Sequence, residues 1–204
     1  MSPACETIDL RELESRPWKN GAGVTRELAV APAGASLGDF DWRISVAEVA
    51  RDAPFSTFDG VDRCIVLLRG AGMRLHGVDE RIDERLDGRR HRPLWFRGEV
   101  PLHASLIDGA CSDLNLMLRR ARFRADVTAH ADTAQGGPAD AGLLLCSEGG
   151  WLVQASGSAR PVALAAMQAL LWRAHMPPLT AQAAAAHSVL LFVQIHARGQ
   201  EGVA

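Results

Sequence analysis

Short apolar runs joined by glycine constrain this chain more than any other feature of its sequence. Residues 64–75 read CIVLLRGAGMRL, and residues 143–153 read LLLCSEGGWLV. An apolar run, a glycine turn and a second apolar run are typical of two antiparallel β-strands joined by a tight turn. Glycine and proline also interrupt the rest of the chain often, which leaves little room for long helices. The sequence therefore predicts an all-β fold.

The two glycine-linked segments begin two similar series of strands. Each is followed by a polar loop, then a short apolar run at 93–96 or 169–172, and then a final apolar run at 114–118 or 189–195. We interpret this repetition as a degenerate duplication of one antiparallel β-sandwich unit. The chain would then consist of two tandem units of the same kind.

The boundaries of the two predicted units follow from composition. Residues 128–141 are rich in Ala, Gly, Asp and Pro and are interpreted as a linker. The first unit would span residues 1–127 and the second, more degenerate unit residues 142–204. Only residues 8–14 and 180–186 are predicted to form a few helical turns.

The composition is that of an ordinary globular protein and disfavours several function classes. Hydrophobic residues make up 48% of the chain and charged residues 23%. The formal net charge, 22 minus 24, is −2, which gives no overall attraction to nucleic acid or membranes. No apolar run approaches the roughly 20 residues of a membrane helix, and residues 1–14 lack the apolar core of a signal peptide. We therefore expect a cytoplasmic protein with neither a nucleic-acid nor a membrane partner.

The histidines and cysteines do not form recognised metal-binding patterns. No two of the 7 histidines are spaced as His-x-His, and no two of the 4 cysteines as CxxC. The Gly-x-Ser-x-Gly spacing at residues 34–38 lacks the strand-turn-helix context of a nucleophile elbow, and no Ser-His-Asp order is visible. We therefore expect no metal, no cofactor and no catalytic nucleophile.

Lys19 and Asn20 stand out because the chain avoids their residue types. Lys19 is the only lysine among 22 Lys+Arg, and Asn20 is one of two asparagines. A lysine supplies a compact ammonium group that arginine does not replace, so Lys19 is predicted to contact a ligand. For Asn20 two roles stay open, because Asn-Gly is also a common turn sequence.

The alternation of residues 42–45 places Arg43 and Ser45 on one face of a predicted strand. A face that carries arginine and serine is suited to the wall of an anion-binding pocket, since a guanidinium group matches a carboxylate. An equally good structural role for Arg43 is an ion pair with a nearby acidic residue. The candidates are Glu27, Asp41 and Glu48.

Arg63 begins the apolar run at 64–68 and follows a turn that contains Gly60. We predict that it binds the ligand's carboxylate. The alternative is a bond to Asp59 or Asp62 that fixes the turn.

Three further candidates alternate with apolar residues on predicted strands. Asn115 lies between leucines and is predicted to point into the barrel or to a loop junction. Thr25 and Glu27 share one face after the glycine turn at 21–23. Glu27 is also a candidate acid or base, although a single carboxylate is weak support for catalysis.

Four ordered motifs in this sequence resemble the HutD/Ves family. They are W-K-N-G-A-G-V-T-R-E at 18–27, F-D-W-R-I-S-V-A at 40–47, P-F-S-T-F-D-G-V-D-R at 54–63 and D-L-N-L-M-L-R-R at 113–120. The resemblance covers residues 13–124 closely. It implies a bicupin, that is, two tandem cupin-like (jelly-roll) antiparallel β-barrels without the cupin metal signature. It also implies that the positions of Arg63 and Ser45 line the ligand pocket.

The resemblance further implies an association with bacterial histidine utilisation. We expect a small-molecule-binding protein whose ligand is a small acidic metabolite, of the urocanate or formyl- or formimino-glutamate type. The alternative is a metal-independent isomerase or hydrolase that uses Glu27 or Lys19 as acid or base. A third, weaker alternative is an assembly protein whose second barrel packs on a partner. A homodimer is an open expectation.

Overall fold

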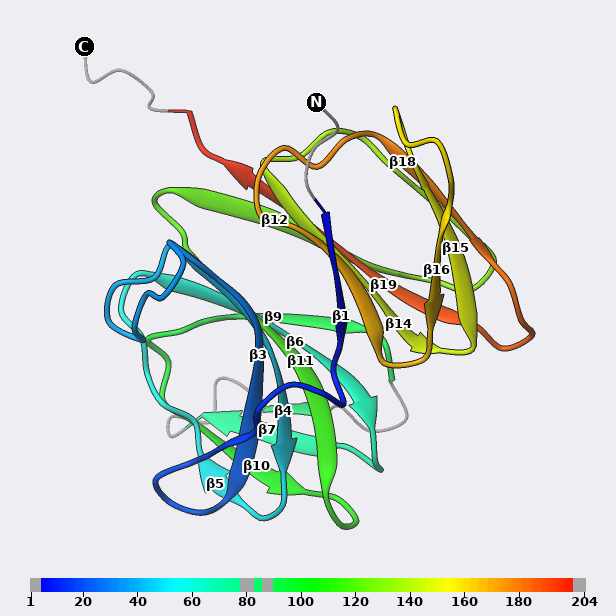
Figure 1. Cartoon of the computed structure of the whole chain (residues 1–204). Helices are drawn as coiled ribbons and strands as arrows, with labels where there is room; N and C mark the ends of the chain where they lie inside the picture. The colour runs from blue at the N-terminus through cyan, green and yellow to red at the C-terminus, as the bar shows by residue number, and fades with distance from the viewer. Residues whose placement is uncertain (1–4, 78–82, 86–89, 200–204) are drawn as a thin grey trace. The chain divides into compact units, whose positions relative to one another are not determined.

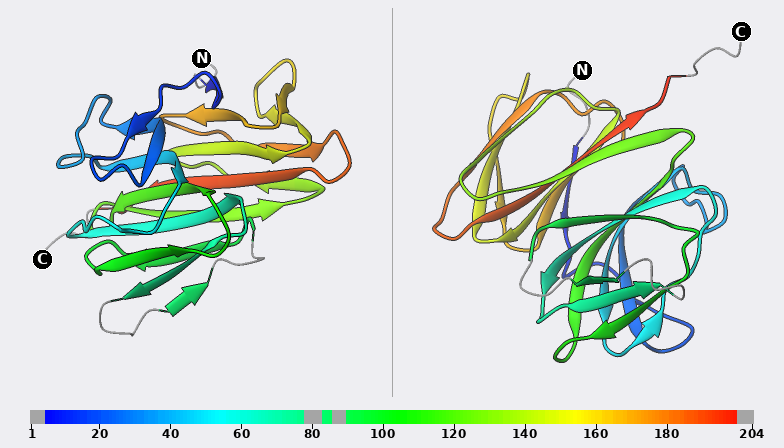
Figure 2. Two further views of the ribbon diagram at one scale, coloured as in Figure 1. Left: turned by 90° about the horizontal axis from the view of Figure 1, so that it is seen from below. Right: turned by 180° about the vertical axis from the view of Figure 1, so that it is seen from behind.

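The computed structural model describes residues 5–77, 83–85 and 90–199. Within these ranges the chain forms strands and turns but no helix, so the predicted all-β fold is confirmed and no helix there could cross a membrane. The chain divides into two compact units. We call Leu13–Ala121 the N-terminal unit, and Met1–Glu12 together with Arg122–Ala204 the C-terminal unit. Figures 1 and 2 show two layers of strands within each unit.

The N-terminal unit consists of a six-stranded and a four-stranded antiparallel sheet. The strand order is β2-β3-β4-β11-β6-β9 in the larger sheet and β5-β10-β7-β8 in the smaller one. The bounds of these strands are β2 Arg16–Pro17, β3 Gly23–Ala31, β4 Trp42–Val49, β5 Ala53–Pro54, β6 Val61–Arg69, β7 Met73–Gly77, β8 Asp83–Arg85, β9 Pro93–Arg97, β10 Leu102–Leu106 and β11 Cys111–Arg119.

The C-terminal unit consists of a five-stranded and a four-stranded antiparallel sheet. The strand order is β1-β17-β14-β19-β12 in the first and β13-β18-β15-β16 in the second. The bounds are β1 Cys5–Asp9, β12 Phe123–His130, β13 Thr133–Gly136, β14 Ala141–Glu148, β15 Gly150–Ala155, β16 Val162–Ala165, β17 Gln168–Trp172, β18 Leu179–Ala183 and β19 Val189–Ala197.

Strands β4 to β11 and strands β12 to β19 repeat one arrangement. In the first copy the orders β9-β6-β11-β4 and β5-β10-β7-β8 occur, and in the second β17-β14-β19-β12 and β13-β18-β15-β16. Each strand of the first copy thus has its counterpart eight strands later. Two four-stranded sheets of this kind form a jelly roll. The predicted duplication is therefore confirmed.

The glycine-linked segments differ from the prediction, because their strands do not pair with each other. β6 and β7 lie in different sheets, and so do β14 and β15. Each glycine turn is instead a corner that takes the chain from one sheet of its unit to the other. At Gly70 the φ angle is 91°, and a Cβ atom there would lie 2.6 Å from the carbonyl oxygen of Ala110. Only glycine meets both conditions at this corner.

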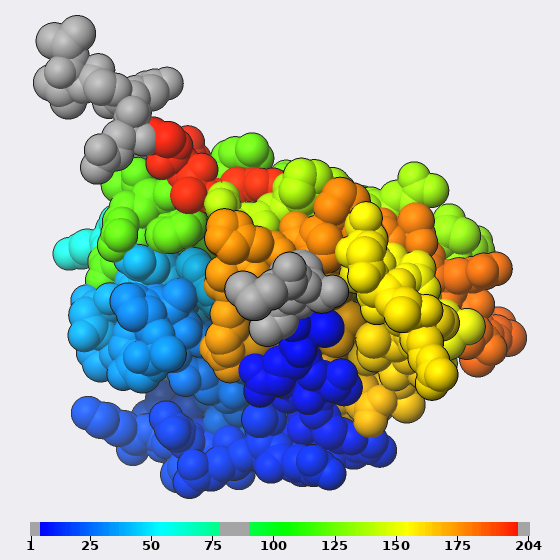
Figure 3. Space-filling model, turned by 45° about the horizontal axis from the view of Figure 1, so that its top comes forward, coloured from blue at the N-terminus to red at the C-terminus, as the bar shows by residue number. Residues whose placement is uncertain are grey.

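The N-terminal strand belongs to the C-terminal unit, which differs from the predicted first unit of residues 1–127. β1 pairs with β17 from Cys5 opposite Trp172 to Asp9 opposite Gln168. In Figure 3 the deep-blue residues of this strand lie at the surface beside residues coloured orange. The local sequence of residues 5–9 does not indicate that this strand pairs with a segment so distant in the chain.

The predicted linker at 128–141 is also structured. It contains the end of β12, the whole of β13 and the first residue of β14. The helical turns expected at 180–186 are not formed, because residues 180–183 belong to β18, an inner strand that pairs with β13 and β15. In both places strand pairing overrides a composition that favours a loop or a helix.

The core of the N-terminal unit lies between its two sheets and fixes which face of the larger sheet points inward. Ile65 and Leu67 on β6 pack in one buried cluster with Leu75 on β7 and Leu102 on β10. The face of the six-stranded sheet that carries Ile65 and Leu67 is therefore its inner face.

Candidate functional site

The inner face of the six-stranded sheet carries a stripe of polar side chains. Asn115 and Asp113 on β11 are the register partners of Ile65 and Leu67 on β6. Because residues directly opposite each other share a face, Asn115 and Asp113 also point inward. The alternate residues of β11 are buried leucines on the opposite face: Leu114, Leu116 and Leu118.

The register extends this stripe across neighbouring strands. Asn115 pairs with Ser45 on β4, and Ser45 pairs with Glu27 on β3. Arg43 precedes Ser45 by two residues in β4, and Arg63 precedes Ile65 by two in β6. Both are register partners of Met117 in β11, one on each side. The inner face therefore brings together six of the eight site residues predicted from the sequence: Thr25, Glu27, Arg43, Ser45, Arg63 and Asn115.

Arg63 is buried in an aromatic cage with one of its donors unused. Its guanidinium carbon lies 5.0, 5.7 and 5.2 Å from the ring centres of Phe55, Phe58 and Phe96. Nη1 donates to the carbonyl oxygen of Ser56 at 3.2 Å, whereas the buried Nε–H has no partner. Burial lowers the pKa of Arg63 to about 10, so the side chain stays cationic at neutral pH. A caged cation with an unused donor is suited to bind an anion.

From the sequence, the alternative role of Arg63 was to fix a turn through a bond to Asp59 or Asp62. The structure shows a bond from Arg63 to a different group of this loop. Asp62 pairs with Arg120 at 3.0 Å and with Arg97 at 3.6 Å. Arg63 supports the turn through the carbonyl group of Ser56 instead of a carboxylate. This bond uses Nη1 and leaves Nε for another partner.

Arg43 forms one of the ion pairs considered from the sequence. Its Nε donates to Glu27 Oε2 at 2.7 Å, and its Nη1 donates to Ser45 Oγ at 3.2 Å. The Arg43 and Glu27 side chains are 15% and 29% exposed. The charges of Arg43 and Glu27 therefore offset each other, which leaves Arg63 as the cation of the stripe without a bonded carboxylate.

Asp113 is a buried carboxyl group without a hydrogen-bond partner. It is 1% exposed, and neither Oδ1 nor Oδ2 accepts a hydrogen bond. Burial raises the pKa of Asp113 to about 7, although attraction to Arg63 acts in the opposite direction. The neighbouring Asn115 Oδ1 is buried and lacks a partner too. Leaving such acceptors unpaired in an apolar interior is unfavourable.

Thr25 is occupied by a contact within the protein. The indole Nε1–H of Trp18 donates to Thr25 Oγ1 at 2.7 Å. Trp18 in turn packs against the core cluster between the sheets. Thr25 thus anchors the entry of the chain into β3 while it shares the inner face.

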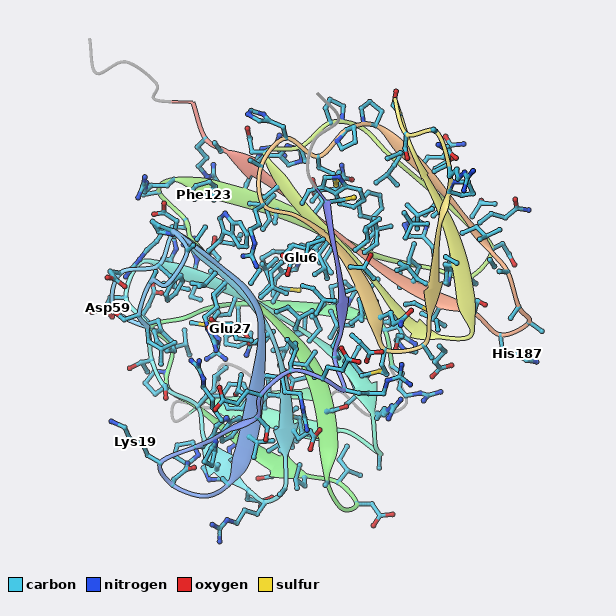
Figure 4. All side chains as sticks on the ribbon, in the orientation of Figure 1. Glu6, Lys19, Glu27, Asp59, Phe123 and His187 are labelled. Carbon is cyan, nitrogen blue, oxygen red and sulfur yellow. The ribbon has the colours of Figure 1, made fainter. Side chains whose placement is uncertain are left out.

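Lys19 and Asn20 are not brought to the inner face. Asn20 Oδ1 accepts the backbone N–H of Ala22 at 3.0 Å, and Gly21 has a φ angle of 65°. This is the turn role that the sequence left open for Asn20. Lys19 is exposed in the same loop, and Figure 4 shows its side chain pointing away from the strands, whereas Glu27 is part of β3.

Sequence reasoning did not select Asp113 or the aromatic cage. Asp113 alternates with Asn115 in the last motif, so the period of the strand was a usable signal. Phe55 and Phe58 belong to the P-F-S-T-F motif. Phe96 comes from β9, and only the pairing of β9 with β6 brings it opposite Arg63.

The last motif also contributes to the loops around the site. Arg119 donates to the carbonyl oxygens of Gly38, Phe40 and Asp59 at 2.7, 3.2 and 3.0 Å. It therefore ties the loop before β4 to the loop before β6, the loop that carries Phe58.

Metal ligands are not grouped in the part of the chain that the structure describes. No three His, Cys, Asp or Glu side chains there are placed to hold one ion. The inner-face residues offer carboxylate, amide, hydroxyl and guanidinium groups. This set can hold a small polar molecule by hydrogen bonds and charge.

Comparison with known proteins identifies relatives of most of the chain. A family model described as HutD matches residues 10–191. A relative, "Protein Ves" of Cronobacter sakazakii, is 38% identical over 147 residues, which are 72% of this chain and 78% of that protein.

Solved structures show the same fold. HutD from Pseudomonas fluorescens SBW25 is 26% identical, covers 96% of this chain and 100% of its own, and superposes with a TM-score of 0.79. A cupin 2 conserved barrel domain protein from Leptotrichia buccalis has 11% identity and a TM-score of 0.56, with 97% and 98% of the two chains covered. The second likeness concerns the fold alone, and it confirms the predicted cupin-like jelly rolls.

Proposed function

The chain belongs to the HutD family, and on this premise we propose that it binds a small acidic metabolite and thereby modulates histidine utilisation. The ligand class that we propose is urocanate or a formyl- or formimino-glutamate. We place this function in the cytoplasm and assign it no metal or cofactor. Assembly as a homodimer stays a prediction.

The observation that carries this proposal is the buried guanidinium of Arg63. It is 6% exposed, stays cationic and keeps an unpaired Nε–H. A carboxylate that accepts a bond from Nε would leave the bond from Nη1 to Ser56 in place. Charge-assisted hydrogen bonds of this kind are stronger than neutral ones.

The charges around Arg63 support an anionic ligand. Arg43 is paired with Glu27 at 2.7 Å, so these two contribute little net charge. Asp113 makes no hydrogen bond to Arg63, and burial raises its pKa to about 7. Arg63 therefore remains the cation of the inner face without a bonded carboxylate, and a ligand carboxylate would pair with it.

The enzyme alternative has less support from these positions. Glu27 Oε2 accepts a bond from Arg43, and Lys19 lies exposed in the loop between β2 and β3. Glu27 is therefore engaged in an ion pair and Lys19 lies away from the inner face, so neither is a free acid or base beside the ligand.

Calorimetric titration of the purified full chain tests the proposal. The probes are urocanate, N-formylglutamate, formiminoglutamate and histidine, each followed afterwards by chromatography for turnover. We expect saturable binding of at least one of the three acids and their recovery unchanged. Absence of binding by all three acids would refute the proposal, and conversion of a bound acid would favour the enzyme alternative.

A further inference from the structure

The inner face collects buried polar atoms that lack partners. Eight buried side-chain nitrogen or oxygen atoms have no hydrogen-bond partner in the described part of the chain. Four of them belong to the inner-face stripe, namely Arg63 Nε, Asp113 Oδ1, Asp113 Oδ2 and Asn115 Oδ1. The other four occur singly on Ser112, His103, Trp151 and Trp172. Since buried polar atoms in proteins normally have partners, a group of four marks a place where a bound molecule or water completes the bonding.

The four atoms differ in what they require. Arg63 Nε is a donor and needs an acceptor, whereas Asn115 Oδ1 and both oxygens of the ionised Asp113 are acceptors and need donors. The protein supplies neither. The molecule that fits them must therefore have an acceptor group at one end and a donor group at the other.

The register separates the donor from the acceptors. Arg63 is opposite Met117, and Asp113 lies four residues earlier on the same strand. At about 3.3 Å per residue, these positions are roughly 13 Å apart along β11. Asn115 lies between them on the same face. Along the strands the order is therefore Arg63, Asn115 and Asp113. A bound ligand would place its acceptor group at Arg63 and its donor group at Asp113.

We propose that the ligand carries a carboxylate that Arg63 holds and, at its other end, an N–H donor that Asp113 and Asn115 accept. The proposal rests on the proposed function, because it assumes that a small acid binds at Arg63. It narrows the ligand class to acids that also carry an imidazole or amide N–H. Asp113 would thus be a specificity-determining residue that selects among small acids.

Selection follows from what happens to Asp113 when the wrong acid binds. An acid without an N–H group would satisfy Arg63 but leave both oxygens of Asp113 buried and unpaired. Sites built to hydrogen-bond a polar group discriminate strongly against analogues that lack it. The carboxylate would therefore supply affinity, and the N–H group would supply specificity.

Two pairs of probes separate these contributions. Urocanate is compared with 3-(2-furyl)acrylate, which keeps the carboxylate but has no N–H group, and N-formylglutamate is compared with glutarate. Each acid is titrated into the full-length protein, into Asp113→Asn and into Asp108→Asn. Asp108 is exposed in the same unit, so its variant controls for the loss of an acidic residue.

We expect the wild-type protein to prefer the N–H member of a pair by about tenfold or more. Asp113→Asn should lose this preference, mainly through weaker binding of the N–H acid, and Asp108→Asn should keep it. Equal binding of both members of a pair to the wild type would overturn the inference and leave the proposed function intact, since water would then satisfy Asp113. Absence of binding by every probe would overturn both. The wild-type comparison decides the matter even if the Asp113 variant does not fold.

Discussion

Arg63 and Asp113 face the same interior from neighbouring strands, yet no hydrogen bond joins them. Burial lowers the pKa of Arg63 to about 10 and raises that of Asp113 to about 7, against the attraction between the two charges. Because Arg63 is opposite Met117, four residues along β11 from Asp113, the two do not form a compact ion pair, and their attraction does not offset the loss of hydration at either group. Each keeps hydrogen-bonding capacity that the protein leaves unused.

The raised pKa of Asp113 predicts a specific pH dependence of stability. The pKa of an unfolded aspartate is about 3.9, whereas burial raises the pKa of Asp113 in the folded protein to about 7. Its contribution to the free energy of unfolding is therefore complete below about pH 4 and is lost as the pH rises through 7. The loss is on the order of a few kcal/mol.

We expect Asp113→Asn to remove this part of the pH dependence. Urea denaturation between pH 4 and 8 should show stability falling less steeply for the variant than for the wild type. Asp108→Asn, at an exposed position of the same unit, should follow the wild type. Parallel pH curves for Asp113→Asn and the wild type would show that Asp113 does not titrate in this range.

The fold could be predicted largely because alternation and repetition are local signals. The period of two along residues 42–45 placed Arg43 and Ser45 on one face, and the structure joins them by a hydrogen bond. The repeated series of strands predicted the duplication. What local signals could not provide was pairing: the glycine turns connect different sheets, and β1 joins β17 more than 150 residues away.

Site residues could be predicted from the sequence where they alternate along a single strand. They could not be predicted where segments distant in sequence come together. Asn115 was selected from its strand, while Asp113 on the same strand was overlooked. The cage of Arg63 combines Phe55 and Phe58 from one loop with Phe96 from β9. Lys19 was selected because it is the only lysine, but it lies in an exposed loop. The rarity of a residue type carries no information about where the residue lies in the fold.

Replacement of Arg63 should weaken ligand binding more than it weakens the fold. Charge-assisted hydrogen bonds contribute roughly 1.5–3 kcal/mol each. Arg63→Ala should therefore reduce the affinity for the acid about 10- to 100-fold. Arg63→Lys should recover only part of it, since lysine restores the charge but not the planar fork.

Calorimetry with urocanate and thermal melting measure the two effects of replacing Arg63. Arg69→Ala, at the exposed end of the same strand, is the matched control and should bind normally. An Arg63→Ala protein that melts far below the wild type and binds normally would assign Arg63 a structural role.

The ion pair between Arg43 and Glu27 should stabilise the N-terminal unit. Arg43 Nε and Glu27 Oε2 are 2.7 Å apart, and the two side chains are partly buried, with 15% and 29% of their surfaces exposed. After allowance for solvent screening, we expect a coupling energy of about 1 kcal/mol. A double-mutant cycle with Arg43→Gln and Glu27→Gln, measured by urea denaturation, gives this energy. Additive effects of the two substitutions would mean that the pair contributes nothing.

Removal of metal should leave ligand binding unchanged. The prediction follows from the absence of His-x-His and CxxC spacings in the sequence. Dialysis against a chelator should not change the affinity for an acid that binds the untreated protein, and elemental analysis should find no stoichiometric zinc, iron or manganese. About one metal ion per chain, with binding lost on its removal, would contradict this prediction.

Ile8→Ala should destabilise the C-terminal unit, because β1 belongs to that unit. Ile8 is 6% exposed and lies opposite Ala169 on β17. Truncation of a buried isoleucine costs about 2–5 kcal/mol, and an edge strand should lie near the lower end. Hydrogen exchange of the amides of β17 should accelerate in Ile8→Ala. Thr7→Ala, at the exposed neighbouring position, should exchange like the wild type. Unchanged exchange in β17 with faster exchange in β3 or β4 would instead place the N-terminal strand with the first unit, as the sequence alone predicted.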